Sequence, residues 1–155
     1  MNRRAFGERV TAMQGSLYRV AASYLRGESD RLDAVAEAIA KAWEKRQTLR
    51  DEALFATWMT RILIRVCVDM QRRQKRLIPT DDVAEKPAED EKIATLREAI
   101  DSLPQKARTM IVLHYMEGYD VREIAKMMGM TKGAVCAGLS RARDKLRAYL
   151  EEDAR

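Results

Sequence analysis

Residues 120–146 read DVREIAKMMGMTKGAVCAGLSRARDKL. Asp120 and Glu123 have the three-residue spacing of a capping box, in which each side chain accepts a hydrogen bond from the other residue's backbone amide. A helix is therefore expected to begin at Asp120, to turn at the permissive backbone of Gly129 and to restart at Thr131. The apolar face of the second helix would consist of Val135, Leu139, Ala142 and Leu146. The stretch predicts a helix-turn-helix.

Two interpretations of this helix pair are open. A short αα-hairpin in an ordinary helical bundle has the same spacing, and a few small or apolar residues at fixed offsets arise by chance. A DNA-binding module needs cations beside its second helix, to contact phosphates. The second helix supplies them, and they favour DNA binding: Lys132, Arg141, Arg143, Lys145 and Arg147.

Helical periodicity also runs through the first 76 residues. Apolar residues recur every three or four positions from Val10 to Leu25, which predicts a first helix ending near Gly27. A second helix is expected over Leu32–Trp43, with Asp30 as its N-cap. The third and longest helix is expected over 53–76 and ends in a run of cations.

Composition supports an all-helical chain. The 155 residues include only 7 glycines and 3 prolines, and helix-forming residue types dominate. We expect an all-α fold of two small helical domains, residues 1–76 and 92–155, the second a winged-helix-like helix-turn-helix domain. The segment 77–91, with two of the three prolines and no apolar period, is expected to be the linker.

Charge is distributed unevenly along the chain. Residues 1–76 hold 16 Lys and Arg against 9 Asp and Glu, residues 77–91 hold 1 against 6, and residues 92–155 hold 12 against 9. Two basic blocks therefore flank an acidic linker, as expected of a protein that binds a phosphate backbone. The cations at 72–76 also suit the negative end of a helix dipole, but they are more numerous than capping requires.

Several function classes are excluded by the residues present. No apolar run approaches the roughly 18 residues that span a bilayer, and no apolar stretch follows the N-terminal Arg3-Arg4, so we expect a cytoplasmic protein without membrane insertion. Cys67, Cys136 and His114 are too few for a structural metal site. No paired nucleophile and base or phosphate-binding loop is present, so we expect no catalytic residues, no metal, no cofactor and no enzyme activity.

The sequence resembles a known family over nearly its whole length. From Leu96 to Leu150 it is similar to region 4 of bacterial RNA polymerase sigma factors, on the motifs Leu103-Pro104, Arg108, Glu123-Ile124-Ala125, Gly129, Val135 and Arg141–Leu146. The earlier half resembles region 2, on Asp33, Glu37, Trp43, Trp58, Ile62, Asp69 and Arg72-Arg73. A chain with only these two regions resembles the extracytoplasmic-function (ECF) group of the sigma-70 superfamily.

The resemblance implies a role for each region. The polymerase clamp would contact Asp33, Glu37, Lys41 and Trp43. The minus 10 promoter element would contact Arg61, Arg65, Asp69, Arg72, Arg73, Lys75 and Arg76, while the loop 46–52 captures a base flipped from the non-template strand. The minus 35 element would contact Arg122, Lys126, Thr131, Lys132, Gly133, Cys136, Ala137, Ser140, Arg141 and Arg143.

Three positions depart from the family pattern. Ala36 replaces a common glutamine, which removes one contact to the clamp, and Arg65 replaces an asparagine that would read bases. On a helical wheel with Val135 and Leu139 inward, the outward residues are Gly133, Ala137, Ser140 and Arg141, with Cys136 and Gly138 beside them. Cys136-Ala137-Gly138 lacks the usual cations at 136 and 138, so we expect closer backbone approach and more shape reading at the minus 35 element. A redox-sensing role for Cys136 is disfavoured because the sequence fixes no basic partner beside it.

The sequence thus predicts a promoter-specificity subunit whose partners are core RNA polymerase and promoter DNA. An anti-sigma factor, if one exists, would clamp both domains. The alternative is a polymerase-independent regulator that uses the same helix-turn-helix, but it leaves the region 2 pattern unexplained.

Overall fold

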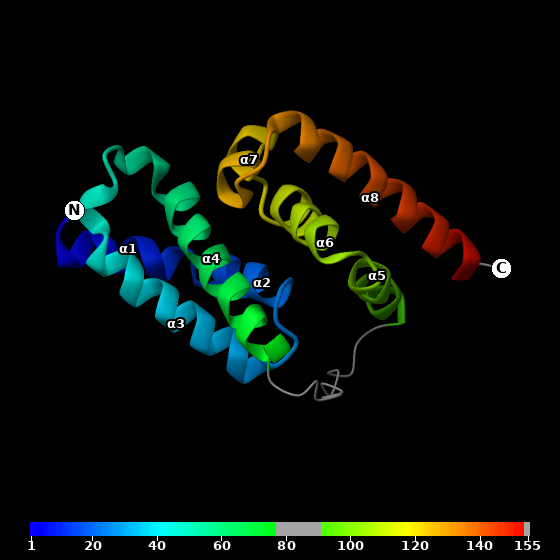
Figure 1. Cartoon of the computed structure of the whole chain (residues 1–155), viewed down its shortest axis with the longest axis horizontal. Coiled ribbons are helices and arrows are strands. Elements are labelled where there is room, and N and C mark those ends of the chain that lie inside the picture. The colour runs from blue at the N-terminus through cyan, green and yellow to red at the C-terminus, as the bar shows by residue number, and fades with distance from the viewer. Residues whose placement is uncertain (77–90, 154–155) are drawn as a thin grey trace.

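The computed structural model describes residues 1–76 and 91–153, and in these ranges the chain forms α-helices, short 3-10 and π-helical turns and loops, without a strand (Figure 1). The predicted linker 77–91 lies outside the described residues except for Glu91, the first residue of α5. In the two described ranges, no helix is both long and apolar enough to cross a membrane.

The first half of the chain forms four helices: α1 (Arg3–Ala12), α2 (Gln14–Ala22), α3 (Glu28–Glu44) and α4 (Phe55–Arg76). The expectation of one helix from Val10 to Leu25 was wrong, because the chain breaks at Met13, where φ is −100° and ψ is 0°. Apolar spacing continues across this break, so periodicity alone did not reveal it.

The beginning of α3 also differs from the expectation. Gly27 is its N-cap, with no side-chain hydrogen bond, and Asp30 lies inside the first turn. The negative charge of Asp30 still suits the positive end of the helix dipole. Three fully buried alanines one turn apart, Ala34, Ala38 and Ala42, let α4 pack closely on α3.

The second half forms α5 (Glu91–Asp101), α6 (Gln105–Ile111), α7 (Val121–Met128) and α8 (Lys132–Asp153). Helix α6 continues directly into a π-helical turn, η3 (Val112–Met116). Helices α7 and α8 form the predicted helix-turn-helix, and Gly129 between them has a φ of 64°, the left-handed conformation that glycine tolerates best.

Gly138 lies where α8 crosses α6. It is buried, and a Cβ atom added there would come within 2.7 Å of Met110 Sδ and 3.0 Å of Met110 Cε. The expectation that Gly138 borders the outward face of α8 was therefore wrong. Its missing side chain serves the packing of two helices rather than the approach to a ligand.

The two halves pack directly on each other. Helix α4 lies against α7 as well as against α2 and α3, and Figure 1 shows α2 and α4 facing the α6–α7 side of the second half. Buried apolar residues from both halves, including Leu63 and Ile64 of α4 and Ile124 and Met127 of α7, belong to one continuous cluster. The periodicity of the sequence predicted two cores and gave no sign that they join.

A leucine at Gly138 should destabilise the fold, because its side chain would have to displace Met110 from a packed interior. Gly138→Leu is expected to lower the free energy of unfolding by about 1–3 kcal/mol in urea denaturation. Gly133→Leu is the matched control, since no atom lies within 4 Å of a Cβ added at Gly133 in the same helix. An equal loss in both variants would show that the α6 contact is not the cause.

Candidate nucleic-acid interface

The beginning of α7 is fixed by the predicted capping box. The Asp120 carboxylate accepts a hydrogen bond from the Glu123 amide at 2.8 Å, and Glu123 Oε1 accepts one from the Asp120 amide at 3.3 Å. The hydrogen bond from the Glu123 backbone is the main reason that the pKa of Asp120 lies below its ordinary value. This arrangement fixes the direction of α7 and so the place of α8.

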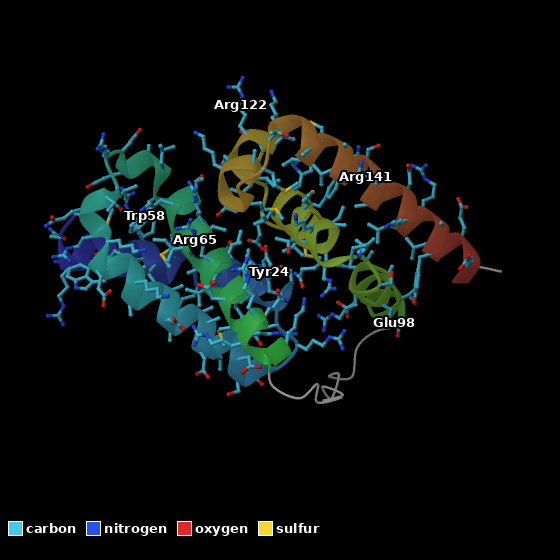
Figure 2. The ribbon with its side chains drawn as sticks, in the orientation of Figure 1. Tyr24, Trp58, Arg65, Glu98, Arg122 and Arg141 are labelled. Atoms are coloured by element: carbon cyan, nitrogen blue, oxygen red, sulfur yellow. The ribbon has the colours of Figure 1, made fainter. Side chains whose placement is uncertain are left out.

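The outward face of the helix-turn-helix is open. Thr131 caps α8 by accepting a hydrogen bond from the Ala134 amide at 3.1 Å. Figure 2 shows Arg122 projecting outward from α7, on the side away from α4. The predicted minus 35 residues are all exposed: Arg122, Lys126, Thr131, Lys132, Gly133, Cys136, Ala137, Ser140, Arg141 and Arg143.

Two members of this set have special surroundings. Arg143 Nη1 donates a hydrogen bond to the Tyr115 hydroxyl at 2.9 Å, which ties α8 back to η3. Cys136 is an exposed free thiol. Because Gly138 faces α6, Cys136 and Ala137 are the two residues of the Cys136-Ala137-Gly138 stretch that lie on the outward surface.

Helix α4 carries the predicted minus 10 residues along one exposed stripe. Arg61, Arg65, Asp69 and Arg72 follow one another at steps of four, four and three, so they share one side of the helix. All four are exposed, as are Arg73 and Lys75, while the side chain of Arg76 lies outside the described residues. Figure 2 labels Arg65 on this helix. The stripe is basic apart from Asp69.

The predicted polymerase residues of α3 are divided between surface and core. Asp33 is exposed. Glu37 forms an ion pair with Lys41, one turn later in the helix, with 3.2 Å between Glu37 Oε1 and Lys41 Nζ. Trp43 packs edge-on against Phe6 with ring centroids 5.3 Å apart, and Arg46 covers its face at 3.9 Å from the centroid. The indole of Trp43 is therefore packed into the core of the first half of the chain and is only partly exposed on the α3 surface.

An ion pair joins the two halves. The Arg19 guanidinium of α2 donates two hydrogen bonds to the Glu117 carboxylate, which follows η3, and the Glu117 side chain is only 4% exposed. Burial opposes ionisation of Glu117, but hydrogen bonds from Arg19 and Ser16 outweigh it and hold the pKa of Glu117 below its ordinary value. The pair is therefore charged at neutral pH.

A chain of hydrogen bonds continues this contact. Gln71 Nε2 of α4 donates to the Tyr24 carbonyl at 2.6 Å and to Gln105 Oε1 at 2.8 Å. Gln105 Nε2 donates to the Ser23 carbonyl at 2.7 Å, and the hydroxyls of Ser23 and Thr109 are hydrogen-bonded at 3.1 Å. We call these contacts, with Arg19–Glu117 and the packing of α4 on α7, the domain interface.

The helix-turn-helix itself takes part in the domain interface. The Thr57 hydroxyl of α4 donates to Glu123 Oε2 at 3.4 Å, and the hydroxyls of Thr60 and Tyr119 lie 3.4 Å apart. The capping glutamate of α7 thus also touches the helix that carries the basic stripe. None of these interface residues was among the predicted functional residues. Thr57 and Thr60, two polar residues between the apolar positions at the beginning of α4, were the signal available in the sequence, and the structure buries both.

Comparison with known proteins assigns the family. Residues 10–77 match the family model "Sigma-70 region 2", and residues 93–146 match "Sigma-70, region 4". RNA polymerase sigma factor SigV of Bacillus subtilis is 34% identical over 93% of this chain and 90% of its own length. The chain belongs to the sigma-70 family of RNA polymerase sigma factors. ECF RNA polymerase sigma factor SigM of Mycobacterium tuberculosis, 30% identical over 96% of this chain and 79% of its own, places it in the ECF group.

Solved structures agree with this assignment. CnrH, in a complex with the cytosolic domain of CnrY, is 28% identical, with a TM-score of 0.76 over 98% of this chain and 91% of its own. The sigma factor RpoE of Bartonella quintana, in a complex with the anti-sigma factor NepR, shares the fold with a TM-score of 0.82 at 22% identity, over 96% of this chain and 98% of its own. This ECF sigma factor is a promoter-recognising subunit of RNA polymerase, and the alternative of a polymerase-independent regulator is not favoured.

Removing the charge of Glu117 should weaken the domain interface at neutral pH only. Glu117→Gln is expected to lower the free energy of unfolding by about 1–2 kcal/mol, because hydrogen bonds to a charged group are lost. The folded-state pKa of Glu117 is lowered, so this stabilisation is present above the ordinary glutamate pKa and disappears as the pH falls through the lowered value.

Urea denaturation at a series of pH values measures this difference. Glu8→Gln is the matched control, because Glu8 forms an exposed ion pair with Arg4 within α1 and should contribute little. A difference between wild type and Glu117→Gln that stays constant down to acidic pH would contradict the role given to the charge.

Proposed function

We propose that this sigma factor binds core RNA polymerase through α3 and promoter DNA through two separate faces, on α4 and on α7–α8. In this proposal residues 1–76 act as the region 2 domain, residues 92–155 as the region 4 domain, and 77–91 as the acidic linker between them. The observation that supports it best is that the basic stripe of α4 and the outward face of α8 are both exposed, although their helices belong to one packed unit.

The two DNA faces have different tasks. The stripe, with Arg61, Arg65, Arg72 and the cations after it, supplies phosphate contacts near the minus 10 element, and the loop 46–52 holds the flipped base. The α8 face enters the major groove of the minus 35 element with short side chains at Cys136 and Ala137. Its specificity then depends on Lys132, Arg141 and Arg122, and on DNA shape.

Promoter binding requires the domain interface to open. The minus 10 and minus 35 elements, as their names say, are about 25 base pairs apart, roughly 85 Å at ~3.4 Å per base pair. Helices in contact, as α4 and α7 are, have axes only about 8–10 Å apart. One packed unit therefore cannot contact both elements at once, and polymerase has to separate the two domains.

The polymerase, on this proposal, supplies the chemistry of transcription, and the sigma factor acts without a reaction or cofactor of its own. Its place of action is the cytoplasm, where the polymerase works on the chromosome. An anti-sigma factor is proposed as a partner, because the similar chain CnrH has been solved in a complex with the cytosolic domain of CnrY. Such a partner would cover α3 or the two DNA faces while the domains are closed.

Purified chain, mixed with core RNA polymerase and genomic promoter fragments, is expected to give run-off transcripts. Asp33→Arg should weaken core binding about tenfold or more, because it reverses a charge on the exposed face of α3 proposed to meet the clamp. Glu28→Arg is the control, since Glu28 is exposed on the same helix about 140° around its axis. Failure of the wild-type chain to bind core at low salt would contradict the proposed function.

A further inference from the structure

The loop between α3 and α4 is anchored at several points on a cluster of aromatic side chains. The first part of the loop, η1 (Arg46–Thr48), is held where Arg46 stacks on Trp43 and where Trp58 Nε1 donates to the Thr48 hydroxyl at 3.2 Å. The second part, η2 (Glu52–Leu54), leads into Phe55. The aromatic cluster consists of Phe6, Trp43, Phe55 and Trp58.

Helix α1 supplies the anchor for the far end of the loop. Arg9 Nη1 donates a hydrogen bond to the Glu52 carbonyl at 2.5 Å, and Arg9 Nη2 lies 3.5 Å from Glu52 Oε2. The same guanidinium lies 5.6 Å from the centroid of the Phe55 ring. One planar group thus contacts the backbone of the loop, its last acidic side chain and the first residue of α4.

The N-terminus of the chain strengthens this anchor. The amino group of Met1 lies 3.9 Å from Glu52 Oε1, and Phe6 packs edge-on against both Phe55 and Trp43. Between the anchors, Gln47, Arg50 and Asp51 are exposed. The loop is therefore a short span of accessible residues between fixed ends.

We infer that Arg9 is a positioning residue for promoter melting, because it holds the loop 46–52 in the shape that receives the flipped base. This inference rests on the proposed function of that loop. Unpairing and unstacking a base costs a few kcal/mol, so the receiving loop must already be in place to recover that cost. Arg9 needs no contact with DNA for this task.

If Arg9 served only the stability of the fold, its loss would weaken binding of both promoter elements, whereas a positioning role affects the minus 10 element alone. The Arg9 and Glu52 side chains are 40% and 58% exposed, and exposed ion pairs contribute only about 0–1 kcal/mol to stability. Loss of Arg9 should therefore leave the fold, core binding and minus 35 binding unchanged. An effect confined to single-stranded minus 10 DNA separates positioning from general stability.

The test uses reconstituted holoenzyme and two DNA probes from a promoter identified by run-off transcription. One probe is a fork-junction DNA with an exposed non-template minus 10 strand, and the other is a duplex carrying only the minus 35 element. Arg9→Met is expected to weaken fork-junction binding about tenfold and leave duplex binding unchanged. Arg9→Lys, which keeps the charge but loses the planar fork, should recover part of the affinity.

Matched variants make the result decisive. Arg4→Met removes another cation of α1, whose partner is Glu8 in the same helix, and should bind both probes as wild type does. Arg50→Ala, within the loop, should weaken fork-junction binding. If Arg50→Ala has this effect and Arg9→Met does not, the inference about Arg9 is overturned; if the loop 46–52 can be replaced by glycine and serine without effect, the proposed base capture itself fails.

Discussion

The packing of α4 against α7 joins the two halves of the chain into one unit. Helix α4 has three sides. One buries Met59 and Leu63, one contacts α7 and the residue Tyr119 before it through Thr57 and Thr60, and one carries the basic stripe. Since the stripe occupies the remaining side, the domains close on each other without covering the residues proposed to bind DNA. In the proposed function, closure therefore sets the distance between the two proposed DNA faces and leaves both exposed.

The chemistry of the domain interface suits a contact that opens. Next to its apolar centre it relies on hydroxyls, glutamines and the pair Arg19–Glu117, and interfaces between domains of one chain are commonly polar in this way. When such groups separate, water replaces most of their hydrogen bonds, so the net cost per bond is about 0.5–1.5 kcal/mol. A partner that binds the open form tightly can supply this energy, and core polymerase is the proposed partner.

Local signals in the sequence predicted elements well and contacts between distant elements poorly. The capping box at Asp120, the turn at Gly129 and the long α4 were predicted because each depends on residues close in sequence. The break at Met13 was missed because apolar spacing runs through it. Gly138 was misplaced because a helical wheel does not show that α6 crosses α8 at that point.

The domain interface could not be read from the sequence for the same reason. Arg19 and Glu117 are 98 residues apart, and in the sequence each looks like an ordinary surface charge. The family resemblance supplied the predicted promoter and polymerase residues but not this pair, since it concerned each region separately. Only the three-dimensional arrangement brings the two charges together.

The distance between the two domains, in the free chain and bound to polymerase, tests the account most directly. Burial raises the pKa of the Cys67 thiol to about 12, so the exposed Cys136 is the native thiol that has to be replaced by serine. Glu8→Cys on α1 and Glu151→Cys on α8 then provide two exposed label sites outside the proposed DNA-binding residues. Resonance energy transfer between labels at 8 and 151 should report a shorter distance in the free chain than after core polymerase is added, because polymerase separates the two domains. An unchanged distance in a complex that still produces run-off transcripts would contradict the account.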